Sequence, residues 1–401
     1  MNTQIDKMTS FIVMEILGRA KDMEKQGISI IHMEVGEPDF NVPAAAVTAA
    51  EDALHSNLTH YTHALGKQEL REAIARMYQR EYGVMVSPSQ ICVTSGSSPA
   101  ILMLALMLFD RDSEVIISNP GYACYKNFIL AAGATPVSVN LRPENGFRYD
   151  IEDIRRCITP RTKAIFVNSP MNPTGAVMSA DFMRELVSLG VPVVSDEIYH
   201  GLTYGEKAHS ILEYVRPFAA EGADTDVFVF NGFSKRFAMT GLRLGYLIAP
   251  EKYMPVLDMM HQNFALCAPS ISQEMGISVL NSTEAFAEAE AMRRTYDERR
   301  QFLLRRLREI GLPPVVEPQG AFYIMVDARR YTDDSYRFAY DILEHAHVGV
   351  TPGVDFGTQG EGFLRLSYAN SMENLAEGMN RLEKYLSSCV RQKCQSRGQT
   401  P

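Results

Sequence analysis

The chain has 401 residues, of which 46% are hydrophobic and 22% are charged, a balance typical of globular proteins. This length exceeds what one hydrophobic core usually organises, so we expect two domains. The net charge of −9 and the lack of a long basic run argue against nucleic-acid binding.

The sequence shows neither a membrane span nor a secretion signal. The longest apolar run, Ala100 to Phe109, is too short to cross a bilayer, and residues 1–7 have no apolar signal core. The six cysteines are scattered and lack the spacing of a metal site, so we predict no bound metal. We therefore expect a cytoplasmic protein with reduced cysteines.

The middle of the chain alternates short apolar runs with helical stretches, which is typical of an α/β fold with a mostly parallel sheet. The predicted strands are 91–94, 114–118, 135–141, 164–168, 192–195 and 227–230. The helices predicted between them are 99–109, 122–132 and 180–189. In such sheets ligands bind at the carboxyl ends of the strands, where several polar residues of this chain fall.

The last third of the chain has a different pattern. The elements predicted there are a long helix at 285–310, strands at 321–326 and 362–368, and a final helix at 372–388. We predict a large domain at 46–284 with a sheet of the seven-stranded type flanked by helices. A smaller α+β domain combines residues 285–390 with the N-terminal segment 1–45. The polar residues 391–401 are predicted to form a disordered tail.

Lys235 carries the most chemical information. It follows the predicted strand 227–230 and enters a loop of Gly, Ser and Thr residues, with Arg243 eight residues further on. A lysine at the end of a buried strand can lose its proton, and an unprotonated amine forms a Schiff base with an aldehyde. Arg243 suits a phosphate. Together they indicate pyridoxal phosphate; the alternative is a surface lysine near a turn.

Other polar residues follow neighbouring predicted strands. Asp196 could pair with a protonated pyridine nitrogen, although a lone Asp there also suits a helix N-cap. Tyr199, three residues on, could reach the same ligand with its phenol or simply pack as a half-buried aromatic. Asn172 lies in a loop with two prolines and a glycine, and its amide could donate to a ring oxygen or mark a turn.

Further candidates lie at a loop, a turn and a strand. Small residues at Gly96, Ser97 and Ser98 join a predicted strand to a helix, whose N-terminus favours a phosphate. Tyr122 could stack on a pyridine ring. Arg365 interrupts an apolar strand, where it needs either a structural ion pair or a substrate carboxylate. Gly36 either offers a backbone N–H to a ligand or forms a plain turn.

Taken together, these residues resemble the class I/II aminotransferases of the aspartate aminotransferase superfamily, which have fold type I of the pyridoxal phosphate enzymes. The resemblance runs from about residue 11 to about 388. The ordered matches are Gly36-Glu37-Pro38, Tyr61 with Gly66, Ser95-Gly96, Tyr122, Asn172-Pro173-Thr174-Gly175, Asp196-Glu197-Ile198-Tyr199, Ser234-Lys235, Gly241-x-Arg243-x-Gly245 and Arg365.

The resemblance implies a role for each matching position. Lys235 becomes the Schiff-base lysine that moves a proton between Cα and C4′, and Asp196 pairs with the pyridine nitrogen. Tyr199 and Asn172 bind O3′, and Tyr122 stacks on the ring. The residues implied for the phosphate are Gly96, Ser97, Ser98, Ser234 and Arg243. The residues implied for the substrate carboxylate are Arg365, Asn172 and Gly36. Tyr61 reaches the phosphate of the neighbouring subunit, which implies a homodimer with shared sites.

Two departures from the family pattern bear on phosphate binding and on the substrate. Gly232 stands where many members carry a serine on the phosphate, and Ser234 is the candidate to compensate. Aspartate-specific bacterial members often place a lysine beside the phosphate loop, where this chain has Ser97-Ser98-Pro99. We therefore expect neutral amino donors to be used at least as well as aspartate. Side-chain recognition is expected from loops near Phe11, Ile12 and His261.

The expected reaction is transfer of an amino group from an α-amino acid to a 2-oxo acid, 2-oxoglutarate, by a pyridoxal/pyridoxamine phosphate ping-pong mechanism. One alternative is a pyridoxal phosphate lyase or synthase on the same fold, which would share Lys235 and Asp196. A second is a non-catalytic sensor domain, which would carry a DNA-binding winged helix before it. Only about 45 residues precede the predicted large domain, and they match the enzyme pattern.

Overall fold

In the computed structural model of the protein, the described residues are 3, 5–215 and 225–397. A seven-stranded sheet forms the centre of the larger part, with the order β2-β8-β7-β6-β5-β3-β4. Its strands are β2 (Ile91–Thr94), β3 (Glu114–Asn119), β4 (Thr135–Asn140), β5 (Thr162–Asn168), β6 (Val193–Asp196), β7 (Val227–Gly232) and β8 (Gly245–Ile248). Neighbours from β7 to β4 pair in parallel, and β8 runs antiparallel to both β7 and β2. The predicted mostly parallel α/β sheet is therefore confirmed.

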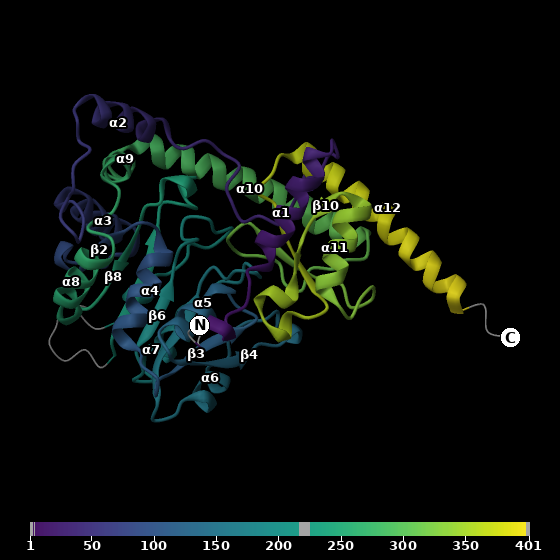
Figure 1. The fold of residues 1–401 in the computed structure, drawn as a ribbon, viewed down its shortest axis with the longest axis horizontal. Coiled ribbons are helices and arrows are strands. Elements are labelled where there is room, and N and C mark those ends of the chain that lie inside the picture. Colours follow the sequence, from purple (N-terminus) through teal and green to yellow (C-terminus); the bar gives the residue numbers. More distant parts are fainter. Residues whose placement is uncertain (1–2, 4, 216–224, 398–401) are drawn as a thin grey trace.

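Helices cover both faces of this sheet (Figure 1). Those of the larger part are α2 (Ala44–His55), α3 (Gln68–Tyr82), α4 (Ser97–Leu108), α5 (Cys124–Ala131), α6 (Ile151–Cys157), α7 (Ala180–Val187), α8 (Met254–Phe264) and α9 (Ser270–Asn281). The remaining helices are α1 (Ile12–Lys25), α10 (Thr283–Glu309), α11 (Ser335–Ala346) and α12 (Met372–Arg397). None of the helices in the described ranges combines the length and the apolar character that a bilayer crossing requires.

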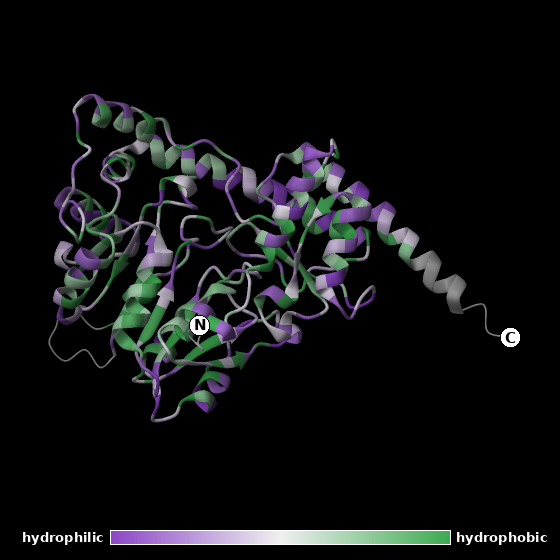
Figure 2. Cartoon of the chain, viewed as in Figure 1, coloured by the Kyte–Doolittle hydropathy of each residue, from purple (hydrophilic) through white to green (hydrophobic). Residues whose placement is uncertain are grey.

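The buried strands explain why the sheet lies between two helical layers. Along β7, Val227 and Val229 belong to one hydrophobic core, and Phe228 and Phe230 belong to the core on the opposite face. Successive side chains of a strand point to opposite faces, so a strand that is apolar at every position needs cover on both sides. Figure 2 shows the resulting hydrophobic strands inside and hydrophilic residues on the outer helices.

A second, smaller part contains the last third of the chain and the N-terminal segment. An antiparallel sheet of three strands has the order β11 (Thr351–Pro352), β12 (Phe363–Ser367) and β9 (Tyr323–Asp327). The N-terminal strand β1 (Ile31–His32) pairs in parallel with β10 (Val348–Gly349). This pairing ties residues near the N-terminus to the last third, as the predicted α+β unit requires; the domain limits themselves stay a prediction.

Strand β8 and the end of the final helix are among the differences from the sequence prediction. Strand β8 was missed because its residues directly follow the loop around Arg243, and apolar runs of four residues carry little periodicity. Helix α12 continues to Arg397, whereas we predicted that it ends at 388 and that a disordered tail begins at 391. The segment after 388 has no Gly or Pro before Gly398 and is rich in Arg, Gln and Lys, which are good helix formers. Residues 398–401 lie outside the described residues.

The close packing of β8 against the start of α4 can be tested at Gly245. A Cβ built on Gly245 would lie 2.8 Å from the carbonyl carbon of Gly96 and 2.9 Å from the amide nitrogen of Ser97. Both are backbone atoms that cannot rotate away, so Gly245→Ala should cost about 1–3 kcal/mol of stability. We expect a lower thermal unfolding midpoint. The control Gly241→Ala meets no atom within 4 Å and should leave the midpoint unchanged; equal midpoints for the two variants would contradict this packing.

Candidate active site

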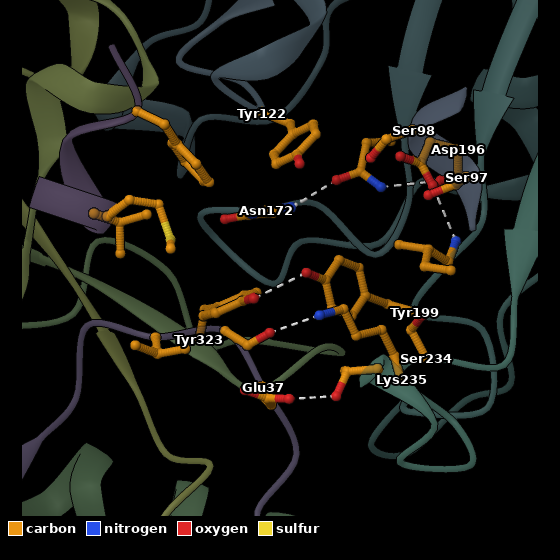
Figure 3. Close-up of a pocket in the computed structure, with 18 of the residues that line it drawn as sticks. Glu37, Ser97, Ser98, Tyr122, Asn172, Asp196, Tyr199, Ser234, Lys235 and Tyr323 are labelled. Atoms are coloured by element: carbon orange, nitrogen blue, oxygen red, sulfur yellow. Dashed lines mark hydrogen bonds between the residues drawn. The ribbon is translucent and has the colours of Figure 1, made fainter. Parts of the chain in front are cut away.

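A cavity of about 360 Å³ lies where the carboxyl ends of the central strands meet the smaller part of the molecule. Figure 3 shows its polar side chains converging from both parts. The central sheet and its loops contribute Ser97, Ser98, Tyr122, Asn168, Asn172, Asp196, Ile198, Tyr199, Ser234, Lys235, Thr240 and Arg243. The N-terminal segment and the last third contribute Phe11, Val13, Met14, Leu17, Val35, Gly36, Glu37, Tyr323 and Arg365.

Asp196, the last residue of β6, is a buried carboxylate at the floor of the cavity. Its Oδ2 accepts a hydrogen bond of 2.5 Å from the Tyr125 hydroxyl, and its Oδ1 accepts one from the backbone N–H of Ile198. Burial raises the pKa of Asp196 to about 6, although both hydrogen bonds stabilise its charged form and oppose the rise. A cation entering the cavity would relieve the cost of this buried charge.

Lys235 follows β7 and donates from Nζ to the backbone carbonyl of Gly36, 2.6 Å away. Burial lowers the pKa of this amine to about 8, and the nearby cations Arg365 and Arg243 add to the effect. Glu37 opposes it, since a neighbouring anion favours the ammonium. A lysine with such a pKa has a substantial neutral fraction near physiological pH, which is the form that reacts with carbonyl compounds.

The N-terminus of α4 forms one end of the cavity and suits an anion. Gly96 precedes this helix with φ +88°, and no side chain in the described part of the chain caps the helix N-terminus. Ser97 and Ser98 of its first turn line the cavity together with Arg243. A Cβ on Gly96 would lie 2.4 Å from Arg243 Nη2, so the missing side chain makes room for this guanidinium. The free N–H groups, the helix dipole and the arginine all favour a phosphate here.

Arg365, in the middle of β12, is a buried cation with neutral hydrogen-bond partners. Its guanidinium donates to Asn172 Oδ1 at 3.0 Å, to Thr351 Oγ1 at 3.1 Å and to the backbone carbonyl of Glu34. No acidic side chain among the described residues forms an ion pair with it, so a structural ion pair does not explain this charge. A carboxylate that enters the cavity would be a bidentate partner for it.

The aromatic side chains of the cavity come from several elements. The hydroxyls of Tyr199 and Tyr323 lie 2.9 Å apart and form a hydrogen bond. Tyr122 follows β3, and its ring packs edge-on against Phe11 with centroids 6.2 Å apart. The ring of Tyr323 lies against the Arg365 guanidinium, 4.2 Å from its carbon to the ring centroid. Planar aromatic surfaces and a buried arginine thus surround the space between Lys235 and the smaller part.

The wall of the cavity formed by α1 is apolar. Phe11, Val13, Met14 and Leu17 line it. The start of this helix is fixed by Asp355 of the 3₁₀ helix η7 (Gly353–Phe356), whose carboxylate accepts from the backbone N–H groups of Ile12 at 3.0 Å and Val13 at 3.3 Å. A carboxylate at a helix N-terminus satisfies free N–H groups and the helix dipole.

Most of the predicted site residues lie at this one cavity. They are Gly36, Ser97, Ser98, Tyr122, Asn172, Asp196, Tyr199, Ser234, Lys235, Arg243 and Arg365. Gly96 lies behind Ser97 and makes room for Arg243, and Tyr61 is 82% exposed and away from the cavity. Of the residues expected near a substrate side chain, Phe11 lines the cavity, but Ile12 and His261 do not; His261 is buried against the Ala64 carbonyl.

Sequence reasoning missed several lining residues, above all Tyr323 and Asn168. Asn168 ends β5 and holds two site elements together, because its Oδ1 accepts from Asn172 N at 2.7 Å and its Nδ2 donates to the Asp196 carbonyl at 2.9 Å. Its position at the end of a predicted strand was a usable signal. Tyr323 begins β9, far along the chain, and no local pattern links it to Lys235.

Residues 28–382 match the family model for aminotransferase class I and II. The chain belongs to this family. It is 37% identical over 378 residues to (5-formylfuran-3-yl)methyl phosphate transaminase of Methanocaldococcus jannaschii, a match that covers 94% of this chain and 97% of that protein. It is 38% identical over 369 residues to aromatic-amino-acid aminotransferase 2 of Thermococcus litoralis, covering 90% of this chain and 93% of that protein.

A solved structure gives the same result for the fold. Aspartate aminotransferase from Thermus thermophilus with maleate superposes with a TM-score of 0.90 at 35% identity, covering 96% of this chain and 99% of that chain. The protein is thus an aminotransferase of fold type I. The relatives are named for different substrates, so their names agree on the reaction and leave the substrate of this chain open.

The hydrogen bond from Tyr125 to Asp196 predicts a pH-dependent stability effect. Tyr125→Phe removes a charge-assisted bond to a buried carboxylate and should cost about 1–3 kcal/mol at about pH 8, where Asp196 is ionised. The loss of stability should be smaller at about pH 5, because Asp196, with a pKa of about 6, is then largely protonated in the folded protein. Thermal unfolding of the cofactor-free protein at the two pH values measures this difference.

Tyr368→Phe is a matched control for that experiment. Tyr368 is also buried, and its hydroxyl donates to the neutral carbonyl of Ala321 at 3.1 Å. Replacing Tyr368 should lower the free energy of unfolding by a similar amount at both pH values. A pH-independent loss for Tyr125→Phe would show that Asp196 does not titrate in this range.

Proposed function

We propose that this aminotransferase moves the amino group of a neutral α-amino acid to a 2-oxo acid, 2-oxoglutarate, with pyridoxal phosphate bound in the cavity. The observation that carries the proposal is that one cavity joins three groups: Lys235 with its lowered pKa, the buried carboxylate of Asp196, and Arg365 without an acidic partner. Aminotransferases of class I and II depend on pyridoxal phosphate, and this arrangement suits that cofactor and an amino-acid substrate.

The residues of the cavity fit the three chemically distinct parts of pyridoxal phosphate. The uncapped α4 N-terminus with Ser97, Ser98 and Arg243 would hold the phosphate, and Ser234 lines the cavity next to Lys235. Asp196 would hold the protonated ring nitrogen, which supplies the cation that this buried carboxylate lacks. The residues proposed for the ring itself and its oxygen are Tyr122, Tyr199 and Asn172.

Pyridoxal phosphate supplies an electron-accepting ring for the electron pair that remains at Cα when its proton leaves. The protein supplies the base. With a pKa of about 8, Lys235 Nζ can take up the Cα proton and release it again near neutral pH, which is the best range for a general acid–base. The Gly36 carbonyl, which accepts from Nζ, holds the amine at the cavity.

Arg365 would orient the substrate through its α-carboxylate. Its guanidinium is held by Asn172, Thr351 and the Glu34 carbonyl, which come from three separate segments. A planar guanidinium fixed in this way accepts a carboxylate in one orientation, so the Cα–H bond is presented to Lys235 in a defined direction. Gly36, beside Lys235, lines the same end of the cavity.

We further propose a cytoplasmic homodimer in which Tyr61 contributes to the phosphate site of the partner. Tyr61 lies outside the cavity of its own chain, and a largely exposed aromatic side chain is typical of an interface. Phe264 and Leu266 are likewise exposed, at 61% and 53%. A partner that covers them would remove a large apolar area from water.

A pyridoxal phosphate lyase would use the same lysine and aspartate, and the acceptor distinguishes the two reactions. We expect that borohydride fixes the cofactor to Lys235 and that amino-group transfer requires 2-oxoglutarate. Lys235→Ala should abolish both, whereas Lys252→Ala, which alters a surface lysine paired with Asp226, should change neither. Peptide mapping and product analysis measure these outcomes. An adduct at another residue would refute the site, and keto acid formed without an acceptor would favour the lyase.

The chemistry of the cavity wall favours neutral donors. Among the described residues that line the cavity, the cations are Lys235, Arg243 and Arg365, and each already has a proposed partner. The α1 side is apolar, and the acidic side chains among the described lining residues are Glu37 and Asp196. The second carboxylate of aspartate would therefore be desolvated without a partner, which is costly. The chain of 2-oxoglutarate is one carbon longer and carries its second carboxylate further from Arg365. An aliphatic or aromatic side chain would instead gain from burial against Phe11, Met14 and Leu17.

We predict that kcat/KM for alanine or an aliphatic or aromatic amino acid is at least equal to that for aspartate, at a fixed 2-oxoglutarate concentration. Met14→Arg should raise the ratio of aspartate to leucine, because it adds a cation to the apolar wall. Met85→Arg, at a side chain that is 69% exposed and away from the cavity, is the control and should leave the ratio unchanged. A preference of the unaltered enzyme for aspartate above about a hundredfold, roughly 2.7 kcal/mol, would contradict the prediction.

A further inference from the structure

We propose that Tyr323 is a positioning residue that tunes the hydrogen bond from Tyr199 to the cofactor and supports the substrate-binding Arg365. The inference rests on the proposed function, because it concerns the cofactor and substrate assigned to this cavity. Tyr323 lies outside the predicted motifs. It would link the cofactor side of the cavity, at Tyr199, with the substrate side, at Arg365.

The contacts of Tyr323 define its position closely. It is 1% exposed, begins β9 and lines the cavity. Its hydroxyl lies 2.9 Å from that of Tyr199, and the two hydroxyls point toward each other (Figure 3). Tyr199 follows β6 in the larger part of the molecule, whereas β9 belongs to the smaller part. The hydroxyl pair is therefore a direct polar contact between the two parts.

Gly36 leaves the space that the Tyr323 hydroxyl occupies. A Cβ built on Gly36 would lie 1.9 Å from the hydroxyl oxygen and 2.8 Å from the ring carbon that bears it. Any side chain at position 36 would displace the phenol from Tyr199. The absence of a side chain at Gly36 thus serves the tyrosine pair, in addition to the role that the sequence predicted for its backbone.

The same ring also supports Arg365. The guanidinium carbon lies 4.2 Å from the ring centroid of Tyr323 and 5.0 Å from that of Phe356. Two aromatic faces next to a buried cation supply part of the stabilisation that an acidic partner would give. They also restrict the guanidinium to a plane in which Asn172 and Thr351 can accept from it.

The direction of the hydrogen bond follows from the number of protons. Each phenol has one O–H group. When Tyr199 donates to the ring oxygen of the cofactor, it has no proton left for Tyr323, so the 2.9 Å contact requires Tyr323 to donate to Tyr199. A hydroxyl that accepts a hydrogen bond is a better donor, because consecutive hydrogen bonds polarise one another. Tyr323 thus strengthens the stabilisation of negative charge on the ring oxygen.

The spectral titration of the bound cofactor tests this role separately from catalysis. We expect Tyr323→Phe to raise the pH midpoint of the cofactor absorbance change by roughly half to one unit, because a less stabilised ring oxygen holds its shared proton to higher pH. The ring remains in place, so KM for the amino acid should stay within about twofold. Tyr323→Leu removes the ring as well and should also raise KM roughly threefold or more.

A double variant shows whether Tyr323 acts through Tyr199. Tyr199→Phe alone should raise the same midpoint, and adding Tyr323→Phe to it should cause no further shift, since the donor to be tuned is gone. Tyr368→Phe is the control for loosening of the aromatic core, because its hydroxyl bonds to Ala321. The pH midpoint of its cofactor absorbance change should equal that of the unaltered enzyme.

An unchanged midpoint in Tyr323→Phe, beside a clear shift in Tyr199→Phe, would overturn the role of Tyr323 and leave the proposed function intact. Equal shifts in Tyr323→Phe and Tyr368→Phe, or additive shifts in the double variant, would also overturn it. If the unaltered enzyme forms no adduct at Lys235 and shows no absorbance titration, the proposed function itself fails, and this inference fails with it.

Discussion

The guanidinium of Arg365 lies inside the protein, 2% exposed, with three neutral acceptors and no acidic side chain among the described residues to pair with it. A buried charge of this kind costs free energy unless its surroundings compensate. The compensation here is partial: a carbonyl, an amide, a hydroxyl and two aromatic faces, with Nε left without a partner. In the proposed function, the carboxylate of the amino acid would complete it. Arg365 would then gain its ionic partner only when the substrate binds, which would favour binding in one orientation.

The short segment 34–37, which follows β1, connects this cation to the rest of the site. The Glu34 carbonyl accepts from Arg365, the Gly36 carbonyl accepts from Lys235, and the Glu37 carboxylate accepts from Thr240, whose own carbonyl accepts from Arg243 Nη1. Strand β1 pairs with β10 of the smaller part, whereas Lys235 and Arg243 belong to loops of the central sheet. A shift of this segment would move the acceptors for Arg365 and Lys235 together, and it would reach Arg243 only through Thr240. The proposed substrate and cofactor ends of the cavity would thus be mechanically linked.

The sequence predicted those parts of the site that lie at strand ends. The apolar runs before Asp196 and Lys235 are buried on both faces, and such strands leave little freedom in where they end. Parallel neighbours then bring Asn168 and Asp196 side by side in register. The sequence could not show Tyr323, because its contact with Tyr199 joins residues 124 positions apart and depends on how the smaller part packs on the sheet. The residues that motifs predict are thus those placed by local chain geometry.

In the proposed function, different elements would carry the reaction and its substrate specificity. Lys235, Asp196 and Asn172 are placed by a sheet that is buried between two helical layers, so their positions change little when surface residues change. The wall that a substrate side chain would contact comes from α1, which is fixed at its start by the Asp355 carboxylate and by the packing of Phe11 on Tyr122. Substitutions along α1 can alter the shape and charge of this wall without touching the proposed catalytic groups. Such a separation would explain how relatives that share more than a third of their residues with this chain, over nearly its whole length, bear names of different substrates for the same reaction.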